Sequence, residues 1–374
     1  MSDALFQPLR LGRLNLPHRV AMAPLTRSRA GQPGNVPTAT NVEYYRQRAG
    51  AALIVTEATQ ISQQGQGYAW TPGIHSLHQI DGWRAVSDAV HAENGKIFLQ
   101  LWHVGRVSHP VFQPGGAPPV APTAMEVPGK TFIVDDEGNG VWAQVPVPRE
   151  LTVKEIAEIV KDFRTAARNA MAAGMDGVEI HAGNGYLLDQ FINSNSNRRT
   201  DAYGGTVENR TRLLFEVVEA VAGEIGAINV GLRLTPMGRF MGMGDETPEA
   251  TFGHIARRLN DWPVAYLHLV EPAIVGTVRD EQDDPRWDGI IKLMRQEFKG
   301  PLMLAGGYTP DSARRAIESG RADLIAFGRP FIANPDLPER LRQHLPLNEA
   351  DASTFFGGGA EGYIDYPVFT AASS

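Results

Sequence analysis

The feature that most constrains the fold is an alternation of short apolar runs with longer segments of helical periodicity, which continues along the whole chain. This alternation is typical of βα units and predicts an α/β protein with a parallel sheet. Eight runs are predicted as strands: Val20–Ala23, Ala52–Thr56, Lys96–Leu101, Gly177–His181, Asn229–Leu234, Ala265–Val270, Leu302–Ala305 and Asp323–Phe327.

Eight such units without a break favour a closed (β/α)8 TIM barrel over the alternative, an open doubly wound sheet. Nothing in the 374 residues resembles an interdomain linker, so we predict a single domain over residues 1–374. We expect an N-terminal hairpin within Leu5–His18 to plug the bottom of the barrel. A long inserted loop after strand 3, His103–Arg149, is expected to hold a hairpin around Thr131–Val145.

Four threonines carry helix-start signals, because a threonine hydroxyl can cap the first free N–H groups of a helix. They are Thr152, which forms a capping box with Glu155, Thr206, Thr247 and Thr309. The last two each precede a proline, which is favoured in the first turn. Their positions agree with the helices that the alternation requires.

The composition excludes several classes of function. A net charge of −7 argues against nucleic acid as a partner, since binding it requires clustered Lys and Arg. The apolar runs are far shorter than the ~20 residues that span a bilayer, and no signal peptide is recognisable, so we predict a cytoplasmic protein without membrane contact. The absence of cysteine excludes disulfides, thiolate-bound clusters and a Cys nucleophile. His103 and His109 lack the spacing of a metal pair, so no metal is predicted.

Working residues of a barrel enzyme lie where its strands end, and the strand ends of this chain are informative. Strands seven and eight are followed by Gly306-Gly307 and Gly328-Arg329, a pattern that predicts a phosphate site made of backbone N–H groups and a cation. The fourth strand ends at His181, with Asn184 and Tyr186 close behind. Two donors and a phenol, which is protonated at neutral pH, indicate an oxyanion-type site with a proton donor.

These residues stand in a longer series of motifs that resembles the Old Yellow Enzyme family, in particular the class I ene-reductases of the pentaerythritol tetranitrate reductase and N-ethylmaleimide reductase type. The resemblance spans nearly the whole chain. The motifs are Met22-Ala23-Pro24-Leu25-Thr26-Arg27, Glu43 to Arg48, Glu57-Ala58-Thr59, Leu99 to His103, Gly185-Tyr186-Leu187-Leu188, Asn197 to Arg210, and Gly357 to Tyr363 with Asp365-Tyr366-Pro367.

The resemblance implies an FMN site. The implied contacts of the ring are Pro24, Leu25, Thr26 at flavin O4, Ala58, Gln100 at the pyrimidine edge and Arg233 near N1 and O2. The phosphate would lie against Gly306, Gly307, Gly328 and Arg329. An arginine near N1 stabilises the anionic reduced flavin.

The resemblance also implies the reaction and its catalytic residues. His181 and Asn184 would bind the substrate carbonyl oxygen, and Tyr186 would protonate the α-carbon after hydride transfer from flavin N5. Tyr68, Trp102 and Phe356 would shape the substrate pocket. The implied activity is NAD(P)H-dependent, ping-pong reduction of electrophilic alkenes: α,β-unsaturated carbonyls, maleimides and nitroalkenes, with nitrate esters as a further class. NADPH is favoured as the reductant, and a monomer or small homo-oligomer is expected.

Two departures from the family pattern affect the substrate site. Many relatives have a second histidine where this chain has Asn184, although asparagine still offers an N–H donor. Phe356 stands where tyrosine is common, so one pocket hydroxyl is missing and the substrate preference is open.

Two other functions are compatible with parts of the sequence. Glu57 and Glu271, both at strand ends, could serve as the acid and nucleophile of a barrel glycosidase. A non-catalytic flavin-binding protein is the other alternative. Gly357, Gly359 and Gly362 spell a dinucleotide-binding fingerprint, but too few residues follow for a βαβ unit. The charged stretch Asn197–Arg210 is interpreted as a structural network of ion pairs and turns.

Overall fold

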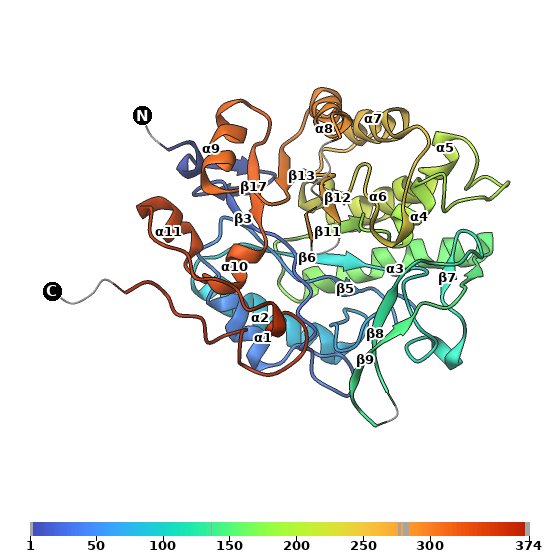
Figure 1. Ribbon diagram of the computed structural model, residues 1–374, viewed down its shortest axis with the longest axis horizontal. Helices are drawn as coiled ribbons and strands as arrows, with labels where there is room; N and C mark the ends of the chain where they lie inside the picture. The colour runs from blue at the N-terminus through green and yellow to red at the C-terminus, as the bar shows by residue number, and fades with distance from the viewer. Residues whose placement is uncertain (1–2, 136, 276–277, 280–283, 371–374) are drawn as a thin grey trace.

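The computed structural model describes residues 3–135, 137–275, 278–279 and 284–370. Eight parallel strands form a closed barrel surrounded by helices (Figure 1). The strands are β3 (Val20–Met22), β4 (Ile54–Val55), β6 (Ile97–Trp102), β11 (Gly177–Ala182), β12 (Val230–Leu234), β13 (Tyr266–Val270), β16 (Leu302–Ala305) and β17 (Leu324–Phe327). Pairing of β17 with β3 and of β6 with β11 completes the ring, which confirms the predicted (β/α)8 barrel.

The bounds of the predicted strands agree with those of the observed strands to within two residues at either end. β16 has the predicted bounds, whereas β4 is limited to two residues of the predicted Ala52–Thr56. The short β5 (Thr59–Gln60) extends the sheet by pairing with the end of β6. The open sheet that sequence alone left possible is therefore excluded.

Helices follow the strands in the order that the alternation predicts. They are α1 (Ala39–Arg46), α2 (Leu77–Ala92), α3 (Val153–Ala172), α4 (Leu187–Ile192), α5 (Val207–Arg210), α6 (Arg212–Ile225), α7 (Pro248–Arg258), α8 (Arg286–Glu297), α9 (Pro310–Glu318), α10 (Arg329–Ala333) and α11 (Leu337–Gln343). In the part of the chain that the structure describes, no helix is long and apolar enough to cross a membrane.

The predicted helix starts were correct in position, with two corrections in detail. Thr152 and Thr309 cap α3 and α9 through their side chains. Thr206 caps only the short α5, because the chain breaks at Thr211 before α6 begins. Thr247 precedes α7, but its side chain makes no capping hydrogen bond. The backbone N–H of Thr247 instead donates to Asp245 Oδ1.

The interior of the barrel changes from apolar to polar along its axis, because alternate residues of each strand point inward. Near the amino ends the inward side chains are apolar, including Phe98, Tyr266 and Met303. The predicted N-terminal hairpin, β1 (Leu9–Leu11) with β2 (Leu14–Leu16), packs its leucines against this layer and closes the barrel bottom. The polar side chains of the interior therefore lie towards the carboxyl ends.

The inserted loop after β6 contains the predicted second hairpin. Strands β8 (Lys130–Val134) and β9 (Gly140–Gln144) pair antiparallel and project from the body of the molecule (Figure 1). β7 (Val120–Ala121) pairs with β10 (Arg149–Glu150), while β14 (Ile274–Val275) pairs with β15 (Val278–Arg279). The β8–β9 hairpin is bonded to the loop before α2 through Ala69 N–H and Phe132 O, 2.8 Å apart.

The C-terminal segment returns to the carboxyl end of the barrel and is held there by three buried arginines. Arg27 donates to the carbonyl oxygens of residues 354, 355 and 362, and Arg29 to those of residues 354, 359 and 361. Arg48 lies 3.8 Å from the ring centre of Tyr44, which stacks on Tyr363 at 4.1 Å. The glycine-rich 357–362 stretch therefore supplies carbonyl acceptors to the buried arginines. It is not part of a βαβ unit, so the dinucleotide fingerprint in its sequence is false, as predicted.

Candidate active site

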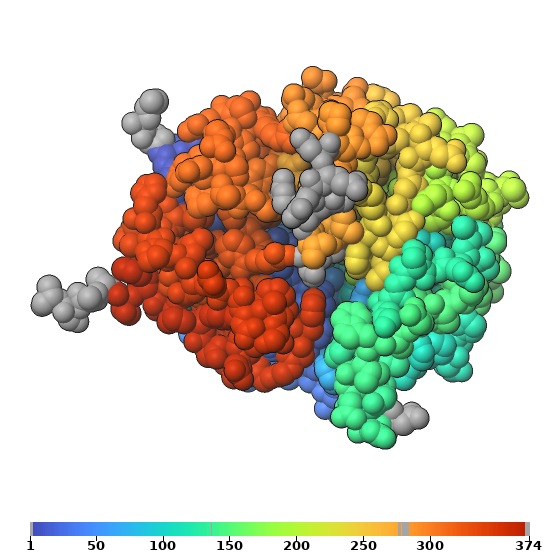
Figure 2. Space-filling model, viewed as in Figure 1, coloured from blue at the N-terminus to red at the C-terminus, as the bar shows by residue number. Residues whose placement is uncertain are grey.

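The candidate site lies at the carboxyl ends of the barrel strands. Figure 2 shows this face hollowed between the C-terminal segment (red) and the β8–β9 hairpin (green), with blue N-terminal chain at its bottom. Ten of the predicted residues lie in or just after seven barrel strands: Thr26, Ala58, Gln100, Trp102, His181, Arg233, Gly306, Gly307, Gly328 and Arg329. The closed barrel therefore gathers residues that are more than 300 positions apart in the sequence.

One wall of the site is aromatic. The ring of Tyr186 meets Trp102 edge-on at 4.9 Å and His181 at 5.3 Å between centroids, while Tyr68 stacks on Trp102 at 5.7 Å. Ala58 and Met241 belong to the same apolar cluster. Five predicted residues, from two strands and the loops that follow three strands, thus form one continuous surface.

Tyr186 is held in its protonated form. Its hydroxyl lies 3.3 Å from that of Tyr68, and burial raises the pKa of Tyr186 to about 12. Burial also raises the pKa of Tyr68 well above its ordinary value. At neutral pH the site consequently offers a phenol that can donate a proton.

His181 is a neutral hydrogen-bonding group. It is 3% exposed, and its Nδ1 atom has no hydrogen-bond partner among the described residues. Burial, with a smaller contribution from the nearby Arg233 charge, lowers its pKa well below the ordinary value. A neutral imidazole carries one N–H, so His181 can bind an oxygen atom by donation rather than by charge.

Asn184 lies beside His181 in a left-handed turn, with φ of 55°. The backbone N–H of Asn184 donates to Thr235 Oγ1 at 2.9 Å, and Thr235 Oγ1 lies 3.4 Å from Asp189 Oδ2. Asp189 also accepts the N–H of Gly185 at 2.8 Å. Sequence reasoning missed Thr235 and Asp189. Asp189 directly follows the Gly185-Tyr186-Leu187-Leu188 motif, and a carboxylate among the apolar residues of that first turn was the available signal.

Replacing Thr235 with valine is expected to weaken phenol binding several-fold, because the variant leaves the Asn184 N–H and Asp189 without their shared partner. An unpaired buried polar group costs about 1–3 kcal/mol, part of which will appear as lost stability. Thr235→Ser keeps the hydroxyl and serves as the matched control. The measurement is titration with a substituted phenol, followed in the spectrum of the FMN that the family resemblance implies. Equal affinities for the valine and serine variants would show that Thr235 does not position Asn184.

Several features fit a flavin mononucleotide. Arg233 is 8% exposed at the centre of the barrel mouth, and its Nε atom has no partner among the described residues. A buried N–H donor without an acceptor is costly, so the Arg233 Nε atom suits a site for an electron-rich ring edge. Thr26 is half-buried four residues after β3, where it follows Pro24 and Leu25 and precedes the arginine anchor.

The expected phosphate site also fits. Gly306 and Gly307 have φ of 131° and 72°, a conformation that favours glycine. The N–H groups of Gly307 and Gly328 have no acceptor in the described ranges, and the exposed Arg329 side chain has no ion-pair partner there. A side chain at position 328 would contact Leu25, so glycine keeps this edge open. Exposed N–H groups and a free cation at adjacent strand ends are what a phosphate requires.

Phe356 lies further out than the other predicted pocket residues. It is 42% exposed, and the next residue, Gly357, donates its N–H to Arg27 O at 3.0 Å. Phe356 therefore belongs to the anchored C-terminal segment at the rim, and its contact with substrate stays a prediction.

The two carboxylates of the glycosidase alternative are both engaged elsewhere. Glu57 accepts from Arg27 N–H and Tyr45 OH, each at 3.3 Å, and burial raises its pKa to about 7. Glu271 binds Tyr308 OH at 2.5 Å and Arg321 at 3.1 Å. Their strands, β4 and β13, are four apart in the eight-stranded ring and so lie on opposite walls. The pair does not form the close constellation that glycoside hydrolysis needs.

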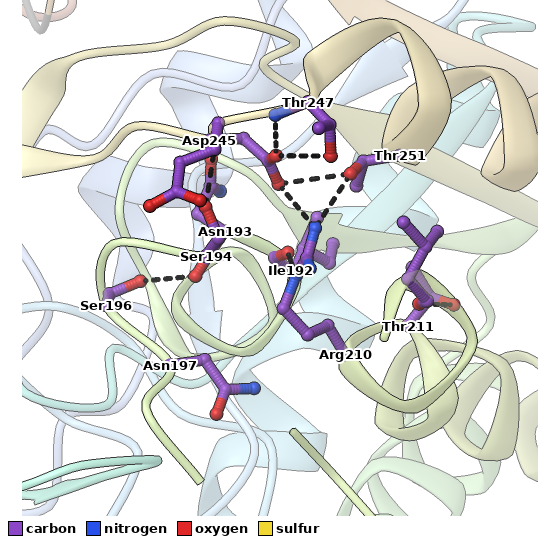
Figure 3. A network of polar contacts seen from close by, with 12 residues as sticks. Ile192, Asn193, Ser194, Ser196, Asn197, Arg210, Thr211, Asp245, Thr247 and Thr251 are labelled. Atoms are coloured by element: carbon purple, nitrogen blue, oxygen red, sulfur yellow. Dashed lines mark hydrogen bonds and ion pairs between the residues drawn. The ribbon is translucent and has the colours of Figure 1, made fainter. Parts of the chain in front are cut away.

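The Asn197–Arg210 stretch is a structural network, as predicted. The Arg210 side chain, 7% exposed, pairs with the fully buried side chain of Asp245 at 3.0 Å and donates to Ile192 O at 2.9 Å (Figure 3). Asp245 also accepts from Thr247 and Thr251 (Figure 3). The network joins the loop after α4 to the start of α7. Among the described residues, no three His, Asp or Glu side chains gather as a metal site would need.

Residues 4–348 match the model of the NADH:flavin oxidoreductase / NADH oxidase family. The chain belongs to this family, that of Old Yellow Enzyme. It is 44% identical over 371 residues to 12-oxophytodienoate reductase 2 of Arabidopsis thaliana, with 98% of this chain and 96% of the relative covered. It is 43% identical over 389 residues to flavin oxidoreductase hxnT of Emericella nidulans, covering 98% and 97%.

Solved structures of Old Yellow Enzyme relatives have the same fold. Morphinone reductase superimposes with a TM-score of 0.94 at 48% identity, covering 99% of this chain and 97% of that one. A morphinone reductase complex with tetrahydroNAD gives 0.92, at 48% identity and 99% coverage of both chains. The Old Yellow Enzyme homologue from Zymomonas mobilis gives 0.91 at 43% identity, covering 98% and 99%. The chain is accordingly a flavin oxidoreductase on a (β/α)8 barrel, and the glycosidase alternative is excluded.

Proposed function

We propose that the protein is an FMN-dependent NAD(P)H ene-reductase that reduces the C=C bonds of α,β-unsaturated carbonyls, maleimides and nitroalkenes, with nitrate esters as further substrates. One observation carries the proposal. A neutral His181 and the protonated Tyr186 lie side by side at the mouth of the barrel, Asn184 stands in the turn between them, and the unpartnered Arg233 Nε and the exposed Arg329 suit FMN. A passive flavin-binding protein would have no use for this arrangement.

In the proposed mechanism, His181 and Asn184 hold the carbonyl oxygen of the substrate and stabilise the negative charge that it gains. Bound FMN supplies hydride transfer, from NAD(P)H in one half-reaction and to the β-carbon of the alkene in the other. Tyr186 then gives its proton to the α-carbon. The FMN itself would be held by Thr26, Gln100 and Arg233 along the ring, and by Gly306, Gly307, Gly328 and Arg329 at the phosphate. Trp102, Tyr68 and Met241 exclude water from the pocket.

The names of the relatives support a reductase of small molecules, since they include 12-oxophytodienoate reductases and morphinone reductase. The tetrahydroNAD complex of morphinone reductase supports a nicotinamide reductant. We propose that this chain uses NADPH in preference to NADH, and that residues 1–374 act as one FMN-binding domain. The continuous core from Leu5 to Tyr363 supports the single domain.

The deciding experiment is anaerobic. Purified protein is expected to carry about one FMN per chain, to bleach with NADPH and to recolour with cyclohexenone. A comparison of NADPH with NADH, over a panel of enones, maleimides, nitroalkenes and nitrate esters, defines the reductant and the substrate class. Protein that binds FMN and bleaches but is not reoxidised by any member of the panel would contradict the proposal.

Replacing His181 or Asn184 with alanine is expected to weaken phenol binding roughly 10- to 100-fold, because each variant removes one donor to a charged oxygen, worth about 1.5–3 kcal/mol. The measurement is spectral titration of the FMN-bound enzyme with a substituted phenol. FMN content should remain at the wild-type level. Unchanged phenol affinity in both variants would falsify the assignment of these two residues.

A further inference from the structure

A buried carboxylate, Glu179, lies in the polar part of the barrel interior and takes no part in the proposed chemistry. It is fully buried on β11, two residues before His181. Its neighbours across the sheet are Gln100 on β6 and Gly231 on β12. An isolated carboxylate in such a place is costly, so its partners must account for its presence.

Both oxygens of Glu179 have a partner. Gln100 Nε2 donates to Oε1 at 2.7 Å, and His268 Nδ1 lies 2.8 Å from Oε2. Because an ionised carboxylate only accepts, the amide nitrogen of Gln100 must face Glu179 and His268 must carry its proton on Nδ1. The carbonyl oxygen of Gln100 therefore points away from Glu179.

The charges of this cluster are balanced by Glu179. Burial lowers the pKa of His268, so the imidazole is neutral, in agreement with an Nε2 atom that has no partner among the described residues. Burial alone would raise the pKa of Glu179, but its hydrogen bonds with His268 and Gln100 and the nearby Arg233 charge hold the pKa below the ordinary value. Arg233 stands beside both His181 and His268 in the strand register. Glu179 is thus the buried counter-charge to Arg233.

We propose that Glu179 is a positioning residue that sets the reduction potential of the bound flavin, by fixing the Gln100 amide and by balancing the Arg233 charge. The inference rests on the proposed function, in which Gln100 and Arg233 contact the pyrimidine edge of FMN. That edge has an N–H donor at N3 and carbonyl acceptors beside it. The fixed carbonyl oxygen of Gln100 suits N3–H, and Arg233 suits the charge that reduction adds.

The sign of the effect follows from the charges. Glu179→Gln removes the negative charge and leaves Arg233 unbalanced, so the reduced, more negative flavin is stabilised relative to the oxidised form. We expect reduced FMN to bind at least tenfold more tightly, relative to oxidised FMN, than in the wild type. For a two-electron couple a tenfold change is an upward shift of about 30 mV.

The test is an anaerobic redox titration of FMN-loaded Glu179→Gln against a reference dye, together with the dissociation constant of oxidised FMN. Asp176→Asn is the matched control, since Asp176 pairs with His91 at 3.0 Å but lies before the amino end of β11. The control is expected to leave the potential unchanged. A Glu179→Gln potential equal to that of Asp176→Asn would overturn the inference.

A second pair of variants keeps the inference testable if Glu179→Gln does not retain FMN. His268→Leu removes the donor to Glu179 and favours a protonated carboxyl, so the potential should rise in the same direction. His268→Asn restores an N–H donor to Glu179 and should return the flavin potential to the wild-type value. Equal potentials in His268→Leu and His268→Asn would contradict the inference that Glu179 sets the flavin potential. Failure of the proposed function looks different: the wild type itself would then lack FMN or enone turnover.

Discussion

Tyr186→Phe is expected to slow reoxidation of the reduced enzyme by cyclohexenone roughly 10²- to 10⁴-fold, the usual contribution of a positioned general acid. The pKa of about 12 keeps the Tyr186 phenol protonated, and its ring contacts both His181 and Trp102 in the pocket. Reduction of the flavin by NADPH should stay near its normal rate, because hydride transfer to N5 needs no such proton.

Stopped-flow spectroscopy of the two half-reactions measures these effects separately. Tyr68→Phe is the matched control, since its hydroxyl lies 3.3 Å from that of Tyr186 and is the nearest alternative acid. If Tyr68→Phe greatly slows reoxidation by cyclohexenone and Tyr186→Phe does not, Tyr68 is the proton donor. Nitroalkenes should suffer less in Tyr186→Phe, because the nitronate formed is a stable anion that can take its proton from water. Equal slowing of both half-reactions would indicate a structural role.

Asp245→Ala is expected to lower the free energy of unfolding by about 3–5 kcal/mol, because it leaves the buried Arg210 charge without its carboxylate. The loss should be seen in denaturant unfolding at saturating FMN, with the flavin spectrum of the folded protein unchanged. Glu158→Ala is the control: its pair with Lys161, at 2.9 Å, is more than half exposed on both sides. Exposed pairs contribute at most about 1 kcal/mol. Equal losses in the two variants would mean that the Figure 3 network is not structural.

The barrel could be predicted because its strands and helix starts are each marked by residues close together in the sequence. Each strand is a short apolar run, and Thr152 or Thr309 marks a helix start within four residues of sequence. The exceptions are also local in origin: Thr206 caps a helix that ends at Arg210, since the chain turns at Thr211 before α6. Neither a hydrophobic pattern nor a cap signal reports such a break.

The supporting contacts of the site could not be predicted in this way, because they join residues far apart in the sequence. Thr235 reaches Asn184 across 51 positions, Glu179 reaches His268 across 89, and Tyr186 reaches Tyr68 across 118. Family motifs pointed to His181, Asn184 and Tyr186 themselves. They did not show which buried partners set the protonation and orientation of those side chains, since that depends on the closed barrel.

The arginine anchor of the C-terminal segment has a consequence for biosynthesis. A nascent chain that has completed β17 already possesses every barrel strand, yet Arg27 and Arg29 still lack the carbonyl acceptors of residues 354–362. Two guanidinium groups that are buried in the finished protein stay solvated until that last stretch emerges. Because Arg27 directly follows Thr26, we expect the chain after β3, which holds the proposed FMN contact Thr26, to settle only after synthesis has passed Gly362. Under the proposed function, we therefore expect FMN to be captured only after synthesis, so that a ribosome stalled between α11 and Tyr363 would display a barrel without flavin.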